Sequence, residues 1–73
     1  MTVVKVIEVI SEGKTIESAM EAAVAEVTRT VKNVNQINVV HIEGIVEKNK
    51  ILKYRVNSNI SFLIEHSIAT PKS

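Results

Sequence analysis

The sequence predicts a single α+β domain with the element order strand, helix, strand, strand. Three observations support this prediction. The segments 2–10, 36–47 and 50–65 are rich in β-branched residues, which favour strands. Apolar residues recur at steps of three and four along 16–33, the spacing of one face of an α-helix. The polar sequence "EKNK" separates the last two strands and is typical of a turn.

The first predicted strand, "TVVKVIEVI", places Lys5 and Glu8 on opposite faces, because side chains alternate along a strand. Gly13 in the following "SEGKT" is a breaker, and Thr15 is the expected helix N-cap. Glu17 falls in the first turn, where the helix dipole favours an anion.

The predicted helix runs from about residue 16 to about residue 33, with Asn33 near its end. Its apolar stripe consists of Ile16, Met20, Ala23, Val27, Val31 and Val34. The alanines keep part of this helix slim, which allows it to lie close against a sheet or another helix.

The second predicted strand, 36–47, is apolar on both faces if its side chains alternate without interruption. One face then carries Val34, Val40, Ile42 and Val46, and the other carries Ile37, Val39 and Ile45. Gly44 within this strand predicts a bulge or a close backbone contact.

The third predicted strand, 50–65, alternates cleanly. Its apolar face carries Tyr54, Val56, Ile60, Phe62 and Ile64, and its polar face carries Lys53, Arg55, Asn57, Asn59 and Ser61. A hairpin pairs this strand with the second one, and a right-handed crossover through the helix places the first strand on its other side. The sheet is therefore antiparallel with the third strand in the centre, and the helix covers only one of its faces. We expect the uncovered face to pack on other copies of the chain or to bind a ligand.

Composition narrows the function classes. The chain has 73 residues, which predicts one domain with a small core, and it has no cysteine for disulfides or thiolate metal sites. A net charge of +1 does not suggest nucleic-acid binding, and no apolar run is long enough to span a membrane or to act as a secretory signal. We expect a cytoplasmic protein that associates with itself, comprising a domain over 1–66 and a polar tail over 67–73.

Catalysis finds little support, since the sequence has no cysteine nucleophile, no Gly-rich phosphate loop and no Ser/His/Asp constellation. We therefore predict that the protein is not an enzyme. His41 and Glu43 share a face at a spacing of two, which is too few ligands for a metal site, and no metal site is predicted.

The ordered set of segments resembles the dodecin family over residues 3–65. The matching features are "KVIEVI", the Thr/Ser-capped Ala-rich helix, "EGIVE" and the "YRVxxxxSF" ending. The resemblance implies a β-α-β-β protomer whose sheet partly wraps one helix, and a hollow assembly of twelve chains. It also implies non-catalytic binding of a flavin such as riboflavin or FMN. Some family members bind coenzyme A, and others bind calcium instead of flavin.

The resemblance places the ligand pocket at Asn35, Gln36, Glu43, Ile45 and Arg55. In flavin-binding members a tryptophan that stacks on the flavin occupies the position of Gln36, and a glutamine that binds the ring edge occupies the position of Arg55. We therefore predict weakened flavin binding. The alternatives are a similar assembly that binds coenzyme A or calcium, a structural oligomer without flavin, and a small interaction module that does not form dodecamers.

Overall fold

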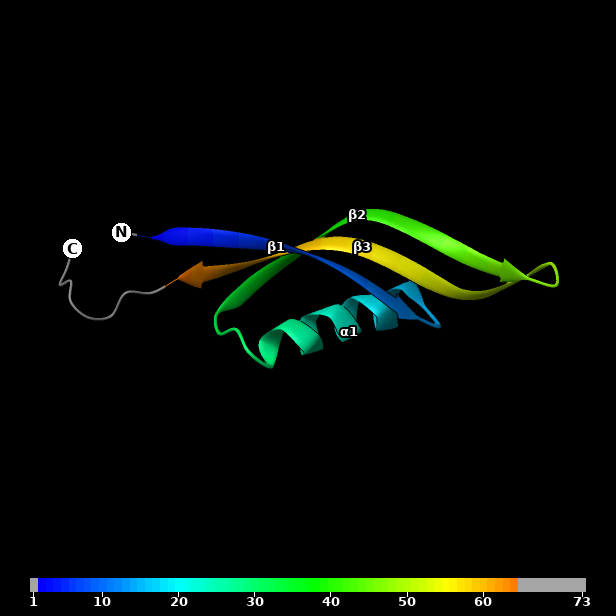
Figure 1. Cartoon of the computed structure of the whole chain (residues 1–73), viewed down its shortest axis with the longest axis horizontal. Helices are drawn as coiled ribbons and strands as arrows, with labels where there is room; N and C mark the ends of the chain where they lie inside the picture. Colours follow the sequence, from blue (N-terminus) through cyan, green and yellow to red (C-terminus); the bar gives the residue numbers. More distant parts are fainter. Residues whose placement is uncertain (1, 65–73) are drawn as a thin grey trace.

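Residues 2–64 are described by a computed structural model of the chain, and they form four elements in the predicted order. These are β1 (Val3–Gly13), α1 (Ile16–Thr28), β2 (Val34–Glu47) and β3 (Lys50–Ile64). Figure 1 shows α1 lying along one face of the sheet, while the β2–β3 hairpin extends beyond the helix. The predicted α+β class and element order are confirmed, whereas the tail over 67–73 lies outside the described residues.

The sheet has the strand order β1-β3-β2, so the third strand is central, as predicted. Both neighbours run antiparallel to β3. Lys48 and Asn49 at the tip of the hairpin have φ values of 53° and 66°. Two consecutive left-handed residues are typical of the type I′ turn, whose twist matches that of the flanking strands.

The N-terminus of α1 is fixed by reciprocal capping. The Ser18 backbone N–H donates to Thr15 Oγ1 at 3.0 Å, and the Thr15 backbone N–H donates to Ser18 Oγ at 3.1 Å. This confirms Thr15 as the N-cap and satisfies two backbone donors that the helix itself leaves unpaired.

The helix ends at Thr28, five residues before the predicted end near Asn33. Arg29 caps it with αR geometry, and the following turn closes when the Val31 backbone N–H donates to the Val27 carbonyl at 3.0 Å. Asn33 then adopts a φ of 64°, which redirects the chain into β2. The apolar spacing continues past the helix because Val31 and Val34 still pack against the core from this turn.

The core lies between α1 and the central strand and is built from small side chains. Ala19, Ala23 and Val27 are its buried helical residues, and Val56 and Ile60 of β3 are fully buried beneath them. The predicted apolar stripe is therefore buried only in part. Ala23 and Val27 are buried, whereas Ile16 is 36% exposed. The two alanines let the helix approach the sheet closely, as their size predicts.

The last residues of β1 make the close contact between the sheet and the helix. This strand continues to Gly13, whereas the sequence predicted that it ends near residue 10. Ser11 Oγ donates to the Ala19 carbonyl at 2.6 Å. A Cβ atom on Gly13 would lie 2.7 Å from Ala19 N and would also collide with Ser18 Oγ. Glycine is thus required at position 13. A Cβ atom on Gly44 would meet only the Ile51 side chain at 3.9 Å, so the prediction of a close contact at Gly44 is wrong.

The prediction that β2 is apolar on both faces is also wrong, because β2 does not alternate without interruption. Its register against β3 shifts between Val34 and Gln36 and again between Val39 and His41. Each bulge adds one residue and reverses the alternation that follows it. The side chains paired with the helix-facing row of β3 are consequently Val34, Ile37, Val39 and Ile42. No register shift occurs at Gly44, where a bulge was expected; a third one lies between Ile45 and Val46.

The molecule is a thin body measuring 59 × 19 × 13 Å, since a single helix covers a three-stranded sheet on one side only. We call the face without the helix the open face. No described element covers it, so any ligand or further copy of the chain has direct access to this face.

Candidate functional site

The open face is predominantly polar on two of its three strands. The central strand β3 presents Lys53, Arg55, Asn57, Asn59 and Ser61, as predicted, because the residues between them face the helix. The bulges in β2 bring Gln36, Asn38, His41, Glu43 and Ile45 to the same face. On β1 the corresponding row is Val4, Val6, Glu8, Ile10 and Glu12.

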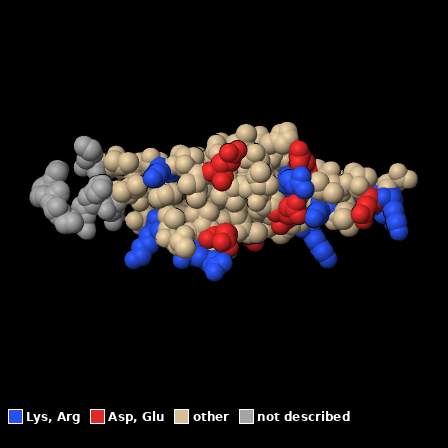
Figure 2. Space-filling view, viewed as in Figure 1, with Lys and Arg blue, Asp and Glu red and all other residues tan. Residues whose placement is uncertain are grey.

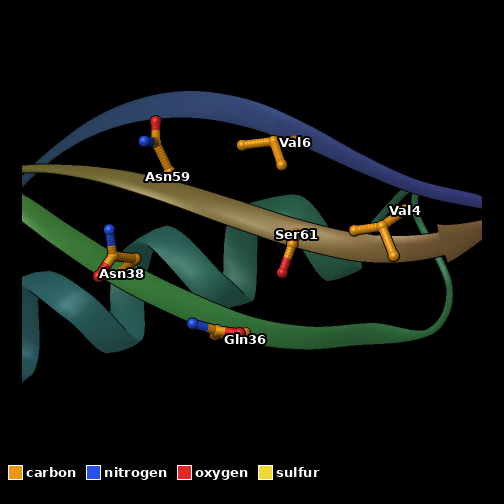
Figure 3. A pocket seen from close by; sticks show the side chains of 6 residues that line it. All are labelled: Val4, Val6, Gln36, Asn38, Asn59 and Ser61. Atoms are coloured by element: carbon orange, nitrogen blue, oxygen red, sulfur yellow. The ribbon is translucent and has the colours of Figure 1, made fainter.

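One half of the open face contains a hollow of about 340 Å³, which we call the amide hollow. Its six lining residues are Val4, Val6, Gln36, Asn38, Asn59 and Ser61. Figure 3 shows that they come from all three strands and lie on the side of the sheet away from α1. The lining combines two valines with amide and hydroxyl groups and contains no charged side chain.

Two of the predicted site residues lie at this hollow. Gln36 lines it and pairs in register with Ser61. Asn35 occupies the adjacent bulge, where its Oδ1 accepts a hydrogen bond from Ser61 Oγ at 3.0 Å. Asn35 therefore orients the Ser61 hydroxyl at the margin of the hollow.

Glu43 and Arg55, two further predicted residues, lie in a second group, which we call the charge cluster. It consists of Glu12, His41, Glu43, Lys53 and Arg55. Lys53 Nζ lies 2.7 Å from Glu12 Oε1, and Arg55 Nη2 lies 3.0 Å from Glu12 Oε2. Arg55 Nη1 also lies 3.6 Å from Glu43 Oε1. Figure 2 shows basic and acidic side chains side by side over the hairpin half of the molecule.

The charged side chains of the charge cluster pair with one another. Hydrogen bonds from Lys53 and then from Arg55 hold the pKa of Glu12 below its ordinary value. The single negative charge of Glu12 is thereby shared between the two cations. Arg55 is engaged by two carboxylates, and an incoming anion would have to compete with both of them.

The five predicted site residues do not form one pocket within a protomer. Gln36 pairs with Ser61 and Glu43 pairs with Arg55, so the two groups are six residues apart along β3. That separation is about 20 Å at the usual rise of a strand. Ile45, which pairs with Lys53, lies at the end of the charge cluster nearest the hairpin tip.

Sequence reasoning missed several residues of the amide hollow. Asn38 was not predicted as a site residue, although uninterrupted alternation already places it on the same face as Gln36. The sequence alone could not predict that Asn38 pairs with Asn59 and Gln36 with Ser61, because this pairing depends on the strand register. Val4 and Val6 join them because β1 lies on the other side of β3.

The open face has no Phe, Tyr or Trp side chain among residues 2–64. The chain contains a single tyrosine and a single phenylalanine, and no tryptophan. Tyr54 and Phe62 both belong to the β3 row that faces the helix, as predicted. A flat ligand on the open face would therefore have to rely on aliphatic and amide contacts.

A buried polar atom also lies on the open face. Asn57 Oδ1 is buried and has no hydrogen-bond partner. Asn57 lies between Ile10 of β1 and His41 of β2, midway between the amide hollow and the charge cluster. Leaving such an acceptor unpaired costs free energy, so this position favours contact with an additional donor.

Residues 2–64 contain neither a cluster of metal-ligating side chains nor a helix able to span a membrane. No group of three or more His, Cys, Asp or Glu side chains in this part of the chain is arranged to hold a metal ion. Over the same range, no helix combines the length and apolar character needed to cross a membrane.

Fold and site together define a small α+β binding protein with a polar, accessible sheet face. The dodecin family model matches residues 3–65, which is nearly the whole described chain, and the protein belongs to the dodecin family. This membership confirms the resemblance and places the chain among small proteins of the flavin-binding type.

Solved structures show the same fold. A mutant of the T. thermophilus dodecin superposes with a TM-score of 0.85 at 24% identity, covering 90% of this chain and 100% of that one. The dodecin from Streptomyces coelicolor gives 0.82 at 21% identity, with coverages of 90% and 96%. The dodecin from Streptomyces davaonensis gives 0.82 at 15% identity, with coverages of 89% and 97%. No curated protein matches the chain by sequence.

Proposed function

We propose that this protein binds and stores a flavin, riboflavin or FMN, without catalysing a reaction on it. The observation that carries the proposal is the position of Gln36. It lies where the family resemblance places the flavin, and it lines the amide hollow on the accessible face of the sheet. Amide groups from two strands can bind the hydrogen-bonding edge of such a ring, and the valines offer it apolar contact.

The proposed working form is a homo-oligomer of twelve chains, as the family resemblance implies. The thin protomer supports self-association, because its small core leaves large apolar side chains accessible. Examples are Val6 at 54% exposure and Ile10 at 62% on the open face. Packing against further copies would bury these side chains and would also supply donors near Asn57.

The proposed flavin affinity is weaker than that of family members with a stacking tryptophan. Stacking of a base on an aromatic side chain is worth roughly 1–3 kcal/mol, and Gln36 does not provide it. Arg55 offers little compensation, because Glu12 and Glu43 already engage its guanidinium. A cytoplasmic location stays a prediction from composition.

One alternative has a specific observation in its favour, namely a structural oligomer without flavin. The absence of an aromatic side chain on the open face of residues 2–64 favours it. For calcium, no group of three or more acidic or other metal-ligating side chains is found within the same residues. Coenzyme A stays an alternative that follows from the family resemblance alone.

Quenching of flavin fluorescence tests the proposal. Riboflavin and FMN are each titrated with the purified protein, and the proposal predicts saturable quenching with a dissociation constant in the micromolar range or above. Native mass spectrometry of the protein as purified then shows whether a flavin mass is retained. Absence of quenching for both flavins at high micromolar protein would favour the structural oligomer.

A further inference from the structure

The amide hollow is electrically neutral. Its lining consists of two valines, three amides and one hydroxyl. These groups both donate and accept hydrogen bonds, but none carries a charge. A bound phosphate would find no ion-pairing partner within the hollow itself.

The basic residues of the open face lie elsewhere and are occupied. Arg55, the lysine or arginine nearest to the hollow along β3, is four residues from Asn59, or about 13 Å of strand. Its guanidinium lies 3.0 Å from Glu12 and 3.6 Å from Glu43. Lys53 is farther away and lies 2.7 Å from Glu12.

On the open face, the charged residue that adjoins the hollow is an acid. Glu8 of β1 pairs in register with Asn59, and it follows Val6 on the open-face row of the same strand. Asn59 and Val6 both line the hollow. Glu8 is exposed, and no described lysine or arginine lies within 4.0 Å of its carboxylate.

We propose that the amide hollow selects an uncharged ligand over its phosphorylated form, with Glu8 as the residue that sets this preference. The inference rests on the proposed function, since it specifies which form of the flavin binds. Glu8 acts at the margin of the site by repelling a phosphate, and the lining provides no cation to offset that repulsion. At roughly 10 Å in water, one carboxylate weakens the binding of a phosphate dianion about fourfold.

Riboflavin and FMN form a suitable pair of probes because they differ only in the phosphate group. Fluorescence titrations of the full chain in low salt are expected to give a dissociation constant for FMN at least about threefold larger than that for riboflavin. The difference should shrink as salt screens the exposed carboxylate. Equal binding of both flavins, or tighter binding of FMN, would overturn the inference while leaving the proposed function intact.

Reversing the charge at Glu8 tests whether this residue sets the preference for riboflavin over FMN. Glu8→Lys should bring the two dissociation constants together or invert their order, because it places a cation beside the hollow without altering the lining. Glu21→Lys is the matched control, since it changes the net charge equally on the exposed side of α1, across the sheet from the hollow. Glu21→Lys should leave the ratio of the FMN and riboflavin dissociation constants unchanged.

The neutral variant Glu8→Gln provides a second measurement, and it introduces no new charge into the fold. It should change the ratio of the FMN and riboflavin dissociation constants in the same direction as Glu8→Lys, by a smaller factor. An unchanged ratio in both Glu8 variants would exclude Glu8 as the selecting residue. If neither flavin binds to the wild-type protein, the proposed function fails, and the inference fails with it.

Discussion

Glu12 and Arg55 face each other across β1 and β3, and their side chains form an ion pair with a separation of 3.0 Å between Oε2 and Nη2. Lys53 binds the other oxygen of the same carboxylate. This relationship changes the interpretation of Arg55. A residue expected to contact a ligand is part of a charge cluster that joins the strands of the sheet.

The charge cluster predicts a pH dependence of stability. Because the folded state lowers the pKa of Glu12 from its ordinary value of 4.5, the unfolded chain binds a proton at this position more readily than the folded chain. The stabilisation by Glu12 is therefore fully present above about pH 4.5 and is lost as the pH falls through the lower, folded-state pKa. Glu12→Gln should therefore reduce the free energy of unfolding more at pH 7 than at pH 3.

Urea denaturation of both proteins at the two pH values measures this difference. Glu21→Gln is a suitable control, because Glu21 lies exposed on α1 and takes no part in the cluster. A destabilisation by Glu12→Gln that is as large at pH 3 as at pH 7 would contradict the assigned role of the carboxylate.

The contact between β1 and α1 predicts that Gly13 does not tolerate a side chain. Gly13→Ala would place a Cβ atom 2.7 Å from Ala19 N, so the helix would have to shift, at a cost of about 1–3 kcal/mol. Gly44→Ala is the matched control, because its Cβ would make only an ordinary contact with Ile51 at 3.9 Å. Denaturation midpoints at equal protein concentration compare the variants, and equal effects of the two substitutions would refute the proposed packing.

The position of Gln36 predicts that an aromatic side chain there restores flavin stacking. Gln36→Trp should lower the dissociation constant for riboflavin roughly five- to 150-fold, which corresponds to the 1–3 kcal/mol of one stacking contact. Fluorescence quenching measures the change, and Glu21→Trp on the other side of the sheet controls for non-specific binding to an added indole. Unchanged affinity in Gln36→Trp would mean that the flavin site lies elsewhere.

The sequence predicts the fold well because most of its patterns act locally. The capping box at Thr15 and the clean alternation of β3 both appear in the structure as expected. The two faces of β2 could not be predicted, because the bulges after Val34 and Val39 depend on pairing with β3 rather than on any local signal. Each bulge reverses the alternation, so a pattern that looks apolar on both sides becomes one apolar and one largely polar face.

The candidate site is predictable only in part for a related reason. Gln36 and Arg55 follow from a family resemblance that runs along the chain, whereas their environments depend on contacts between strands. The ion pair of Arg55 with Glu12 joins residues 43 positions apart, and Val4 reaches the hollow from β1 only through the order of the strands. Neither contact has a signature in the local sequence.

Native mass spectrometry of the full chain in the presence of riboflavin tests the central claim most directly, because it measures assembly and ligand binding together. One chain has a mass of 8.1 kDa. A dodecin-type flavin store predicts a species of about 97 kDa, twelve times the 8.1 kDa chain, that carries additional riboflavin mass. A species near 8.1 kDa, or a larger assembly that retains no riboflavin at saturating concentration, would contradict it.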